Sequence, residues 1–104
     1  MFIRKERFEG EVSNVECAGN GFCRIRVNSA YSEDVYEVEI GQKAIELINY
    51  NLEEVKKNKE DAELVGSSAN IYFYKGVEKL EIVFIEPMLY SISFACHKVE
   101  KLKL

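Results

Sequence analysis

The chain has few of the residues on which most catalytic chemistry depends. Its 104 residues include one histidine and three cysteines. A Ser-His-acid or Cys-His arrangement would have to use that single histidine, His97, and no Gly-x-Ser-x-Gly pattern supplies a nucleophile. No Gly-x-x-x-x-Gly-Lys or Gly-x-Gly-x-x-Gly motif offers a phosphate loop. We therefore expect a non-enzymatic protein without a cofactor.

Signals for membranes and secretion are missing as well. No apolar run is long enough to cross a bilayer. The N-terminus is charged from Arg4 onward, too early for a secretory signal. An odd number of cysteines fits a reducing compartment better than a disulfide scaffold. These features favour a cytoplasmic protein with no membrane partner, or a mature protein from which a leader has been removed.

The potential metal ligands are badly spaced for a zinc site. Structural zinc sites usually offer two cysteines separated by two to four residues, but five residues separate Cys17 from Cys23. Cys96 and His97 are adjacent in a strand-like stretch, so their side chains would point to opposite faces. We therefore expect no metal site.

What the chain does have is a globular composition with a small acidic excess. Hydrophobic residues make up 47% and charged residues 31%, which predicts a folded protein, and the length suits a single domain over residues 1–104. The 14 basic and 18 acidic residues give a net charge of −4. Such a chain has no overall attraction to phosphate backbones, although a local basic patch is compatible with it.

Turn residues divide the chain into strand-like stretches on both sides of one helical stretch. Residues from Ala44 to Val55 recur at helical spacing, and the charged segment 56–63 follows as a helix end or loop. Alternatively, Asn49-Tyr50-Asn51 interrupts that helix and a second one begins at Leu52. Alternating hydrophobic residues predict strands at 8–17, 22–27, 35–40, 70–74 and 80–85, the last ended by Pro87, and a sixth from about 89, extended by 99–104.

The first hairpin can be given a register. A change of parity near Ser13-Asn14 predicts a bulge, and Gly19-Asn20-Gly21 is a strong turn signal. A three-residue loop places Cys17 opposite Cys23, with apolar residues on one face, whereas a two-residue loop would mix core and solvent faces. The two cysteines are then either small apolar core residues, the interpretation we favour, or a cross-strand disulfide.

The element order β-β-β-α-β-β-β, with a bent first strand, resembles that of the OB-fold. This resemblance implies an α+β, mainly β domain in which six antiparallel strands form an OB-like small barrel. The alternative is an open antiparallel sheet with one helix packed across it. Neither architecture implies a function by itself.

The features fit best with binding of a protein partner or self-association, as in an inhibitor, an immunity-type factor or an assembly subunit. The last strand offers a long apolar edge that another chain could pair with. Acidic stretches at 32–34 and 60–63 could meet a basic partner. The candidate partner-binding residues, including those of the alternative function below, are Arg24, Arg26, Tyr72, Tyr74, Tyr90 and Ile92.

The alternative function is binding of single-stranded nucleic acid. Two arginines share the solvent face of strand 22–27, and two tyrosines share one face of strand 70–74; together these are the ingredients of a stacking platform. Glu37 and Glu39 would lie on the same face as the arginines and cancel much of their charge, and the tyrosines could instead pack under the helix. A third alternative is an enzyme whose active site another subunit completes.

Overall fold

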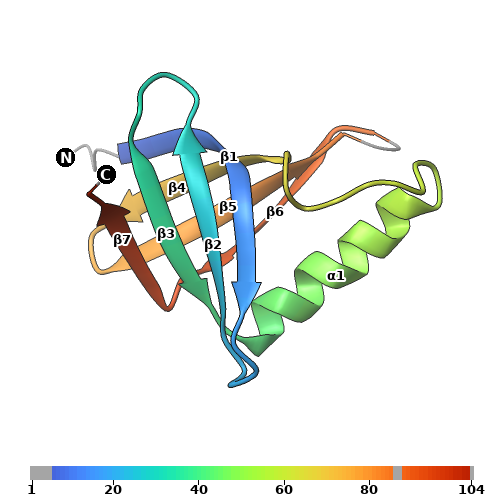
Figure 1. Ribbon diagram of the computed structural model, residues 1–104, viewed down its shortest axis with the longest axis horizontal. Coiled ribbons are helices and arrows are strands. Elements are labelled where there is room, and N and C mark those ends of the chain that lie inside the picture. Colours follow the sequence, from blue (N-terminus) through green and yellow to red (C-terminus); the bar gives the residue numbers. More distant parts are fainter. Residues whose placement is uncertain (1–5, 86–87, 104) are drawn as a thin grey trace.

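The computed structural model describes residues 6–85 and 88–103, and these residues form one antiparallel sheet and one helix. The sheet is curled into a half-barrel (Figure 1), with strand order β6-β5-β4-β1-β2-β3-β7. The predicted α+β, mainly β class is therefore confirmed. The elements are β1 (Glu6–Cys17), β2 (Cys23–Ser29), β3 (Val35–Ile40), α1 (Gln42–Lys56), β4 (Ser68–Tyr74), β5 (Val77–Phe84), β6 (Tyr90–Ala95) and β7 (Lys98–Leu102).

The predicted sixth strand is two strands, so the described residues form seven strands rather than six. The chain changes partner at Cys96 and His97. The Cys96 amide donates to the Glu78 carbonyl of β5 at 2.9 Å, and the His97 amide donates to the Glu39 carbonyl of β3 at 2.8 Å. Two consecutive residues thus bond to β5 and to β3, which are the second strands from the two opposite edges of the sheet. This change of partner divides β6 from β7 and brings the two ends of the half-barrel together.

Strand β1 is bent and belongs to both halves of the sheet. Residues 6–11 pair with β4, and residues 10–17 pair with β2. The register shifts between Val12 and Asn14, which confirms the predicted bulge. Gly10 takes part in both ladders, and a Cβ atom there would lie 2.1 Å from the Asn28 carbonyl oxygen. The bend therefore requires a residue without a side chain.

The β1–β2 hairpin has the predicted register. Cys17 lies opposite Cys23, and Val15 lies opposite Ile25. The two cysteines are 4.1 Å apart at Cα and are joined in a disulfide. Our preference for two reduced apolar residues was therefore wrong, because the register brings the sulfur atoms within bonding distance. Cys23 is nevertheless also a buried core residue.

Removing this disulfide should lower the stability measurably. A cross-link that closes so short a loop contributes about 2 kcal/mol on the loop-entropy model. We expect the double variant Cys17→Ala, Cys23→Ala to melt about 10 °C lower than the wild type in thermal unfolding followed by circular dichroism. A reductant should lower the melting temperature of the wild type and leave that of the variant unchanged. Titration of three thiols in unreduced, denatured protein would contradict the disulfide.

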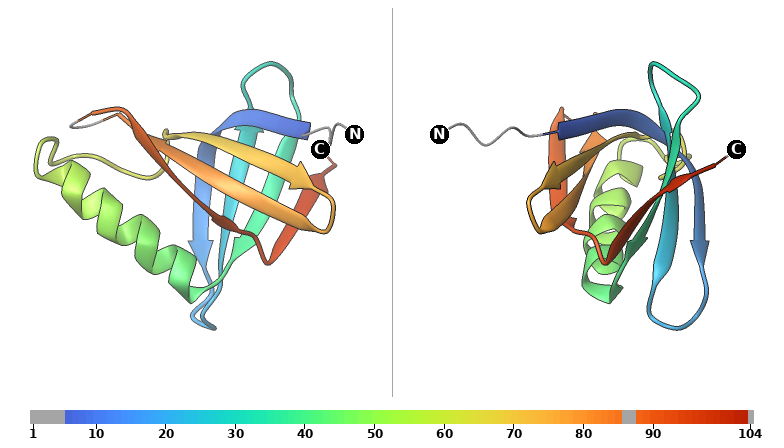
Figure 2. Two further views of the ribbon diagram at one scale, coloured as in Figure 1. Left: turned by 180° about the vertical axis from the view of Figure 1, so that it is seen from behind. Right: turned by 90° about the vertical axis from the view of Figure 1, so that its left-hand side faces the viewer.

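Helix α1 covers the open side of the half-barrel, between its two halves (Figure 2). Its buried residues Ala44, Ile48 and Val55 face the sheet. The helix is continuous, so the predicted interruption at Asn49-Tyr50-Asn51 is wrong. The Asn51 side-chain amide donates to the Leu47 carbonyl oxygen at 2.8 Å, one turn back in the same helix, instead of capping a new one.

The core lies between the inner faces of the sheet and the helix. Among the described residues no polar or charged side chain is buried, and none of the described helices is long and apolar enough to span a membrane. Burial of this apolar surface is the main stabilising term of the fold. The residues that are at most 2% exposed are Val12, Ile25, Val27, Val38, Ile40, Ala69, Ile71, Leu80 and Ile82.

Candidate protein-binding surface

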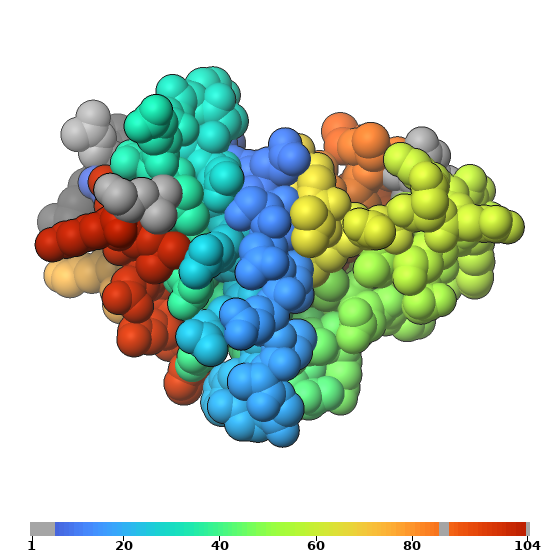
Figure 3. Space-filling view, viewed as in Figure 1, coloured from blue at the N-terminus to red at the C-terminus, as the bar shows by residue number. Residues whose placement is uncertain are grey.

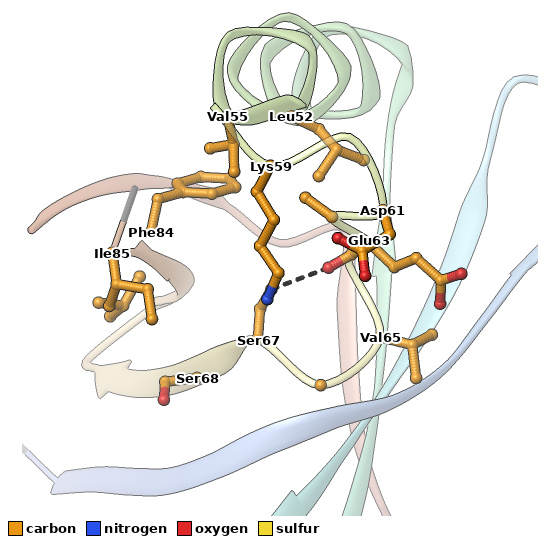
Figure 4. Close-up of a pocket in the computed structure, with 13 residues that line it drawn as sticks. Leu52, Val55, Lys59, Asp61, Glu63, Val65, Ser67, Ser68, Phe84 and Ile85 are labelled. Atoms are coloured by element: carbon orange, nitrogen blue, oxygen red, sulfur yellow. Dashed lines mark hydrogen bonds between the residues drawn. The ribbon is translucent and has the colours of Figure 1, made fainter. Parts of the chain in front are cut away.

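A hollow of about 340 Å³ lies between the C-terminal end of α1, the segment after it and the end of β5 (Figure 4). Its apolar wall comes from α1 and β5 and includes Leu52, Val55 and Phe84. Asp61 and Glu63 stand on its rim, and the Lys59 side chain lies across it in Figure 4. We call this site the hollow. Its full lining is Leu52, Val55, Lys59, Asp61, Ala62, Glu63, Val65, Gly66, Ser67, Ser68, Val83, Phe84 and Ile85.

Backbone hydrogen bonds fix the segment that forms the rim of the hollow. The Gly66 amide donates to the Val12 carbonyl at 2.8 Å, and the Val12 amide donates to the Ser67 carbonyl at 2.9 Å. These bonds tie the segment to the bulge of β1. Gly66 has a φ of +96°, which favours glycine at this turn. The space-filling surface is indented between this segment and the β5–β6 end (Figure 3), so the hollow is open to solvent.

Four exposed apolar side chains lie at the hollow or in the chain next to it, because Val65 and Ile85 line the hollow and Met88 and Leu89 belong to the β5–β6 connection that follows Ile85. Eight large hydrophobic residues are exposed in the described part of the chain, and six of them belong to α1, the segment after it and the β5–β6 connection. Ile85, Met88 and Leu89 are 69–73% exposed. An exposed apolar cluster beside a hollow is typical of a protein-interaction surface. The six residues are Leu47, Tyr50, Val65, Ile85, Met88 and Leu89.

The acidic rim of the hollow is only partly neutralised, by Lys59, which lies across it. The two lysines where the helix ends are engaged locally, since Lys56 pairs with Glu53 at 3.6 Å and Lys57 with Glu54 at 3.0 Å. Within residues 6–85 and 88–103 no ion pair involves the three acidic residues that follow the helix, which are Glu60, Asp61 and Glu63. The other predicted acidic stretch differs, because Asp34 pairs with Lys101 at 3.5 Å. The hollow therefore combines apolar walls with a net negative charge, because its lining has two carboxylates, Asp61 and Glu63, and one lysine, Lys59.

The two arginines predicted as binding residues share one carboxylate. Arg26 Nε lies 3.3 Å from Glu37 Oε2, and Arg24 Nη1 lies 3.9 Å from Glu37 Oε1. Both arginine side chains are about half exposed on the outer face of β2. Glu39 is directly opposite Arg24 on β3. As predicted, acidic side chains accompany the arginines on this face, and they reduce its positive potential.

The two predicted tyrosines lie on the other half of the sheet. Ile71 and Phe73 point into the core, so Tyr72 and Tyr74 are on the outer face of β4 rather than under the helix. Their rings stack with centroids 6.3 Å apart, and Tyr72 Oη donates to Glu81 Oε1 at 3.1 Å.

The structure does not bring the arginines and the tyrosines together. Tyr72 pairs with Arg7 of β1, whereas Arg26 pairs with Asn14. These β1 positions are separated by about 20 Å of strand and by the bend at Gly10. A single stacking platform built from all four predicted side chains is therefore not present.

Tyr90 and Ile92, the remaining predicted binding residues, point inward. Both are half-buried and pack against the core, and the Tyr90 ring lies 5.3 Å from that of Phe84. Burial, followed by the charge of Glu54, raises the pKa of Tyr90. Their exposed neighbours on the strand are small residues such as Ser91 and Ser93. The large apolar side chains of β6 therefore contribute mainly to the fold.

The residues considered for metal binding are also separated. Cys17 and Cys23 form the disulfide, and His97 packs on the Phe22 ring with its Nε2 3.6 Å from Glu39 Oε1. No group of three potential metal ligands is found in the part of the chain that the structure describes. Cys96 is a free cysteine.

The Cys96 thiol should be almost inert in the folded protein. Burial, and to a smaller extent the charge of Glu78, raises the pKa of the Cys96 thiol to about 12. The reactive thiolate is therefore about a thousandfold scarcer at pH 8 than in the unfolded chain. We expect alkylation of Cys96 by iodoacetamide, followed by mass spectrometry, to be slower by a comparable factor in native protein. Equal rates in native and denatured protein would contradict this burial.

The hollow could not be identified from the sequence because its parts are distant along the chain. Of the segments that form the hollow, the sequence predicted only the acidic stretch 60–63 as a part of a binding surface. Residues of α1, the segment 59–68 and β5 come together only when the sheet curls around the helix. Comparisons with protein-family models, curated proteins and solved structures found no match, so the functional interpretation rests on the geometry of this surface.

Proposed function

We propose that this chain is a non-enzymatic protein-binding domain whose binding surface is the hollow and the apolar residues beside it. The observation that supports the proposal is that four of the eight exposed large hydrophobic residues, Val65, Ile85, Met88 and Leu89, line the hollow or belong to the β5–β6 connection next to it. Burying such side chains in a complex would contribute about 25 cal/mol for each Å² removed from water. An inhibitor, an immunity-type factor or an assembly subunit would use such a surface.

The hollow suits an anchoring side chain of a partner. Its volume of about 340 Å³ accommodates one large side chain with some of its neighbours. The apolar wall formed by Leu52, Val55 and Phe84 would contact an aliphatic stem, while Asp61 and Glu63 would favour a positively charged group. A partner with apolar and basic residues therefore fits better than an acidic one.

Single-stranded nucleic acid has less support as a ligand. The arginines of β2 are paired with Glu37, and the tyrosines of β4 lie on the other half of the sheet. The hollow itself has an acidic rim, which repels phosphates. Nucleic-acid binding would show an affinity that falls steeply with salt and with Arg24→Ala, and lack of binding at low salt would remove it.

A variant of one exposed wall residue tests the proposal. Ile85 is 69% exposed, so Ile85→Asp should leave the melting temperature unchanged. We expect wild-type protein to retain a partner from nuclease-treated native extract. Calorimetry with the purified partner should then show binding weakened at least about thirtyfold by Ile85→Asp, as for an interface hot spot.

Tyr31 provides the matched control. It is 82% exposed but lies in the β2–β3 loop, away from the hollow. Tyr31→Ser should bind the partner with wild-type affinity. Loss of binding in Tyr31→Ser with full binding in Ile85→Asp would overturn our choice of surface. If the protein retained a partner only from extract without nuclease treatment, the proposed function would be overturned.

A further inference from the structure

We propose that the partner of the hollow is a second copy of this chain, which inserts its β4–β5 turn. This inference rests on the proposed function, because it names the occupant of the same surface. We define the basic turn as residues 75–79, which are Lys75, Gly76, Val77, Glu78 and Lys79. Its apolar residue would enter the hollow of the next molecule while its lysines approach Asp61 and Glu63.

Charge selects this surface among those that the chain offers. Apart from the four residues at the hollow and the helix residues Leu47 and Tyr50, the exposed large hydrophobic residues in the described ranges are Tyr31 and Val77. Tyr31 lies near acidic residues, since its hydroxyl donates to Glu9 Oε2 at 2.5 Å and Glu33 follows it closely. An acidic surface would be repelled by the rim of the hollow. Val77 is 43% exposed and lies two residues from Lys75 and from Lys79, with one acidic neighbour, Glu78.

The lysines of the basic turn carry charge that the chain itself does not neutralise. No ion pair in the described part of the chain involves Lys75 or Lys79. Lys79 Nζ instead lies 5.8 Å from the centroid of the Tyr74 ring. With Glu78 counted, the basic turn has a net positive charge, and it complements the net negative charge that Asp61 and Glu63 leave around the hollow after Lys59 is counted.

The basic turn is also preorganised. Tyr74 pairs directly with Val77, so only Lys75 and Gly76 form the loop, and Gly76 has a φ of +86°. A two-residue hairpin turn loses little conformational freedom when it binds. Val77 is therefore presented on a rigid element rather than on a loop that must first become ordered.

The two surfaces lie toward opposite ends of the longest axis of the molecule: the β4–β5 connection is at the left of Figure 1 and the C-terminal end of α1 at its right, and the rear view in Figure 2 agrees. Insertion of one end into the other is a heterologous contact, which repeats as a chain of subunits or closes into a ring.

Lys59 lies across the hollow and has the same charge as the basic turn. Lys59→Ala should therefore strengthen the association.

Complementation between two variants tests this arrangement. Val77→Asp disables the basic turn and keeps the hollow, whereas Ile85→Asp disables the hollow and keeps the basic turn. In sedimentation velocity we expect concentration-dependent association of the wild type and monomers for each variant alone. An equimolar mixture should form heterodimers and nothing larger. Circular dichroism should show that both variants retain the wild-type fold.

Each other outcome overturns the inference in a recognisable way. A wild type that stays monomeric at millimolar concentration overturns self-association, and the experiment with the extract then decides the proposed function separately. Loss of association with Ile85→Asp but not with Val77→Asp overturns the role of the basic turn and retains the hollow. Association that neither variant changes, or a mixture that stays monomeric, overturns the head-to-tail contact.

Discussion

Gly10→Ala should be among the most damaging single substitutions in this protein. The added Cβ atom would lie 2.1 Å from the Asn28 carbonyl oxygen and 2.8 Å from Val27 Cγ1. The nearest atom belongs to the backbone of β2, so it cannot turn aside as a side chain could. We expect a loss of about 3 kcal/mol or more in the free energy of unfolding, measured by urea denaturation.

Gly41 is the matched control for this prediction. It precedes α1 with φ −91°, and a Cβ atom there would meet only the Phe22 ring at 4.0 Å. The helix has no side-chain cap at this position, so Gly41→Ser should leave stability unchanged or raise it by up to about 1 kcal/mol. Equal stability of Gly10→Ala and the wild type would contradict the tight crossing of β1 and β2.

Ile92→Lys should destabilise the fold by about 2 kcal/mol or more. Ile92 is half-buried, lies opposite Ile82 and packs against the core. The substitution removes apolar contacts and brings a charge to the edge of an apolar environment. The melting temperature in differential scanning calorimetry should fall by at least about 10 °C.

Ser93→Lys tests the same strand on its other face. Ser93 is exposed and lies opposite Glu81, so a lysine there should change stability by no more than about 0.5 kcal/mol. The difference between the two lysine variants measures the inward orientation of the apolar residues of β6. If Ile92→Lys kept the wild-type stability and lost only the binding of the partner, this result would instead support the predicted binding surface on the last strand.

The hairpin and the bend of β1 were predictable because local patterns determine them. Only one loop length places Cys17 opposite Cys23 with apolar residues on a single face, and the change of parity near Ser13 marks the bulge. The strand 35–40 was predicted with the bounds that the structure has. In these segments short-range alternation and turn residues agree with the tertiary structure, so the sequence alone is sufficient.

The divided last strand and the continuous helix were not predictable in this way. Nothing in the alternation from Tyr90 to Cys96 reveals that the chain changes partner at His97, because that change depends on where β3 and β5 lie. Asn51 is compatible with both a cap and a helix interior, and the tertiary packing of Ile48 and Val55 decides between them.

Candidate binding residues were the hardest feature to predict. The sequence shows which residues share a face of one strand, but it does not show which strands lie side by side. Arg26 and Tyr72 were combined into one hypothetical platform, whereas β1 separates them. Ile85 and Val65 acquire their importance only from the hollow that they line.

A titration followed by nuclear magnetic resonance tests most directly whether the hollow is the binding surface. ¹⁵N-labelled protein would be titrated with the species that binds it, either unlabelled copies of the chain or the purified partner. We predict that the largest changes in amide chemical shift fall on Val65, Ser67, Phe84 and Ile85. Changes centred on the outer faces of β2 and β4, with those four amides unaffected, would contradict it.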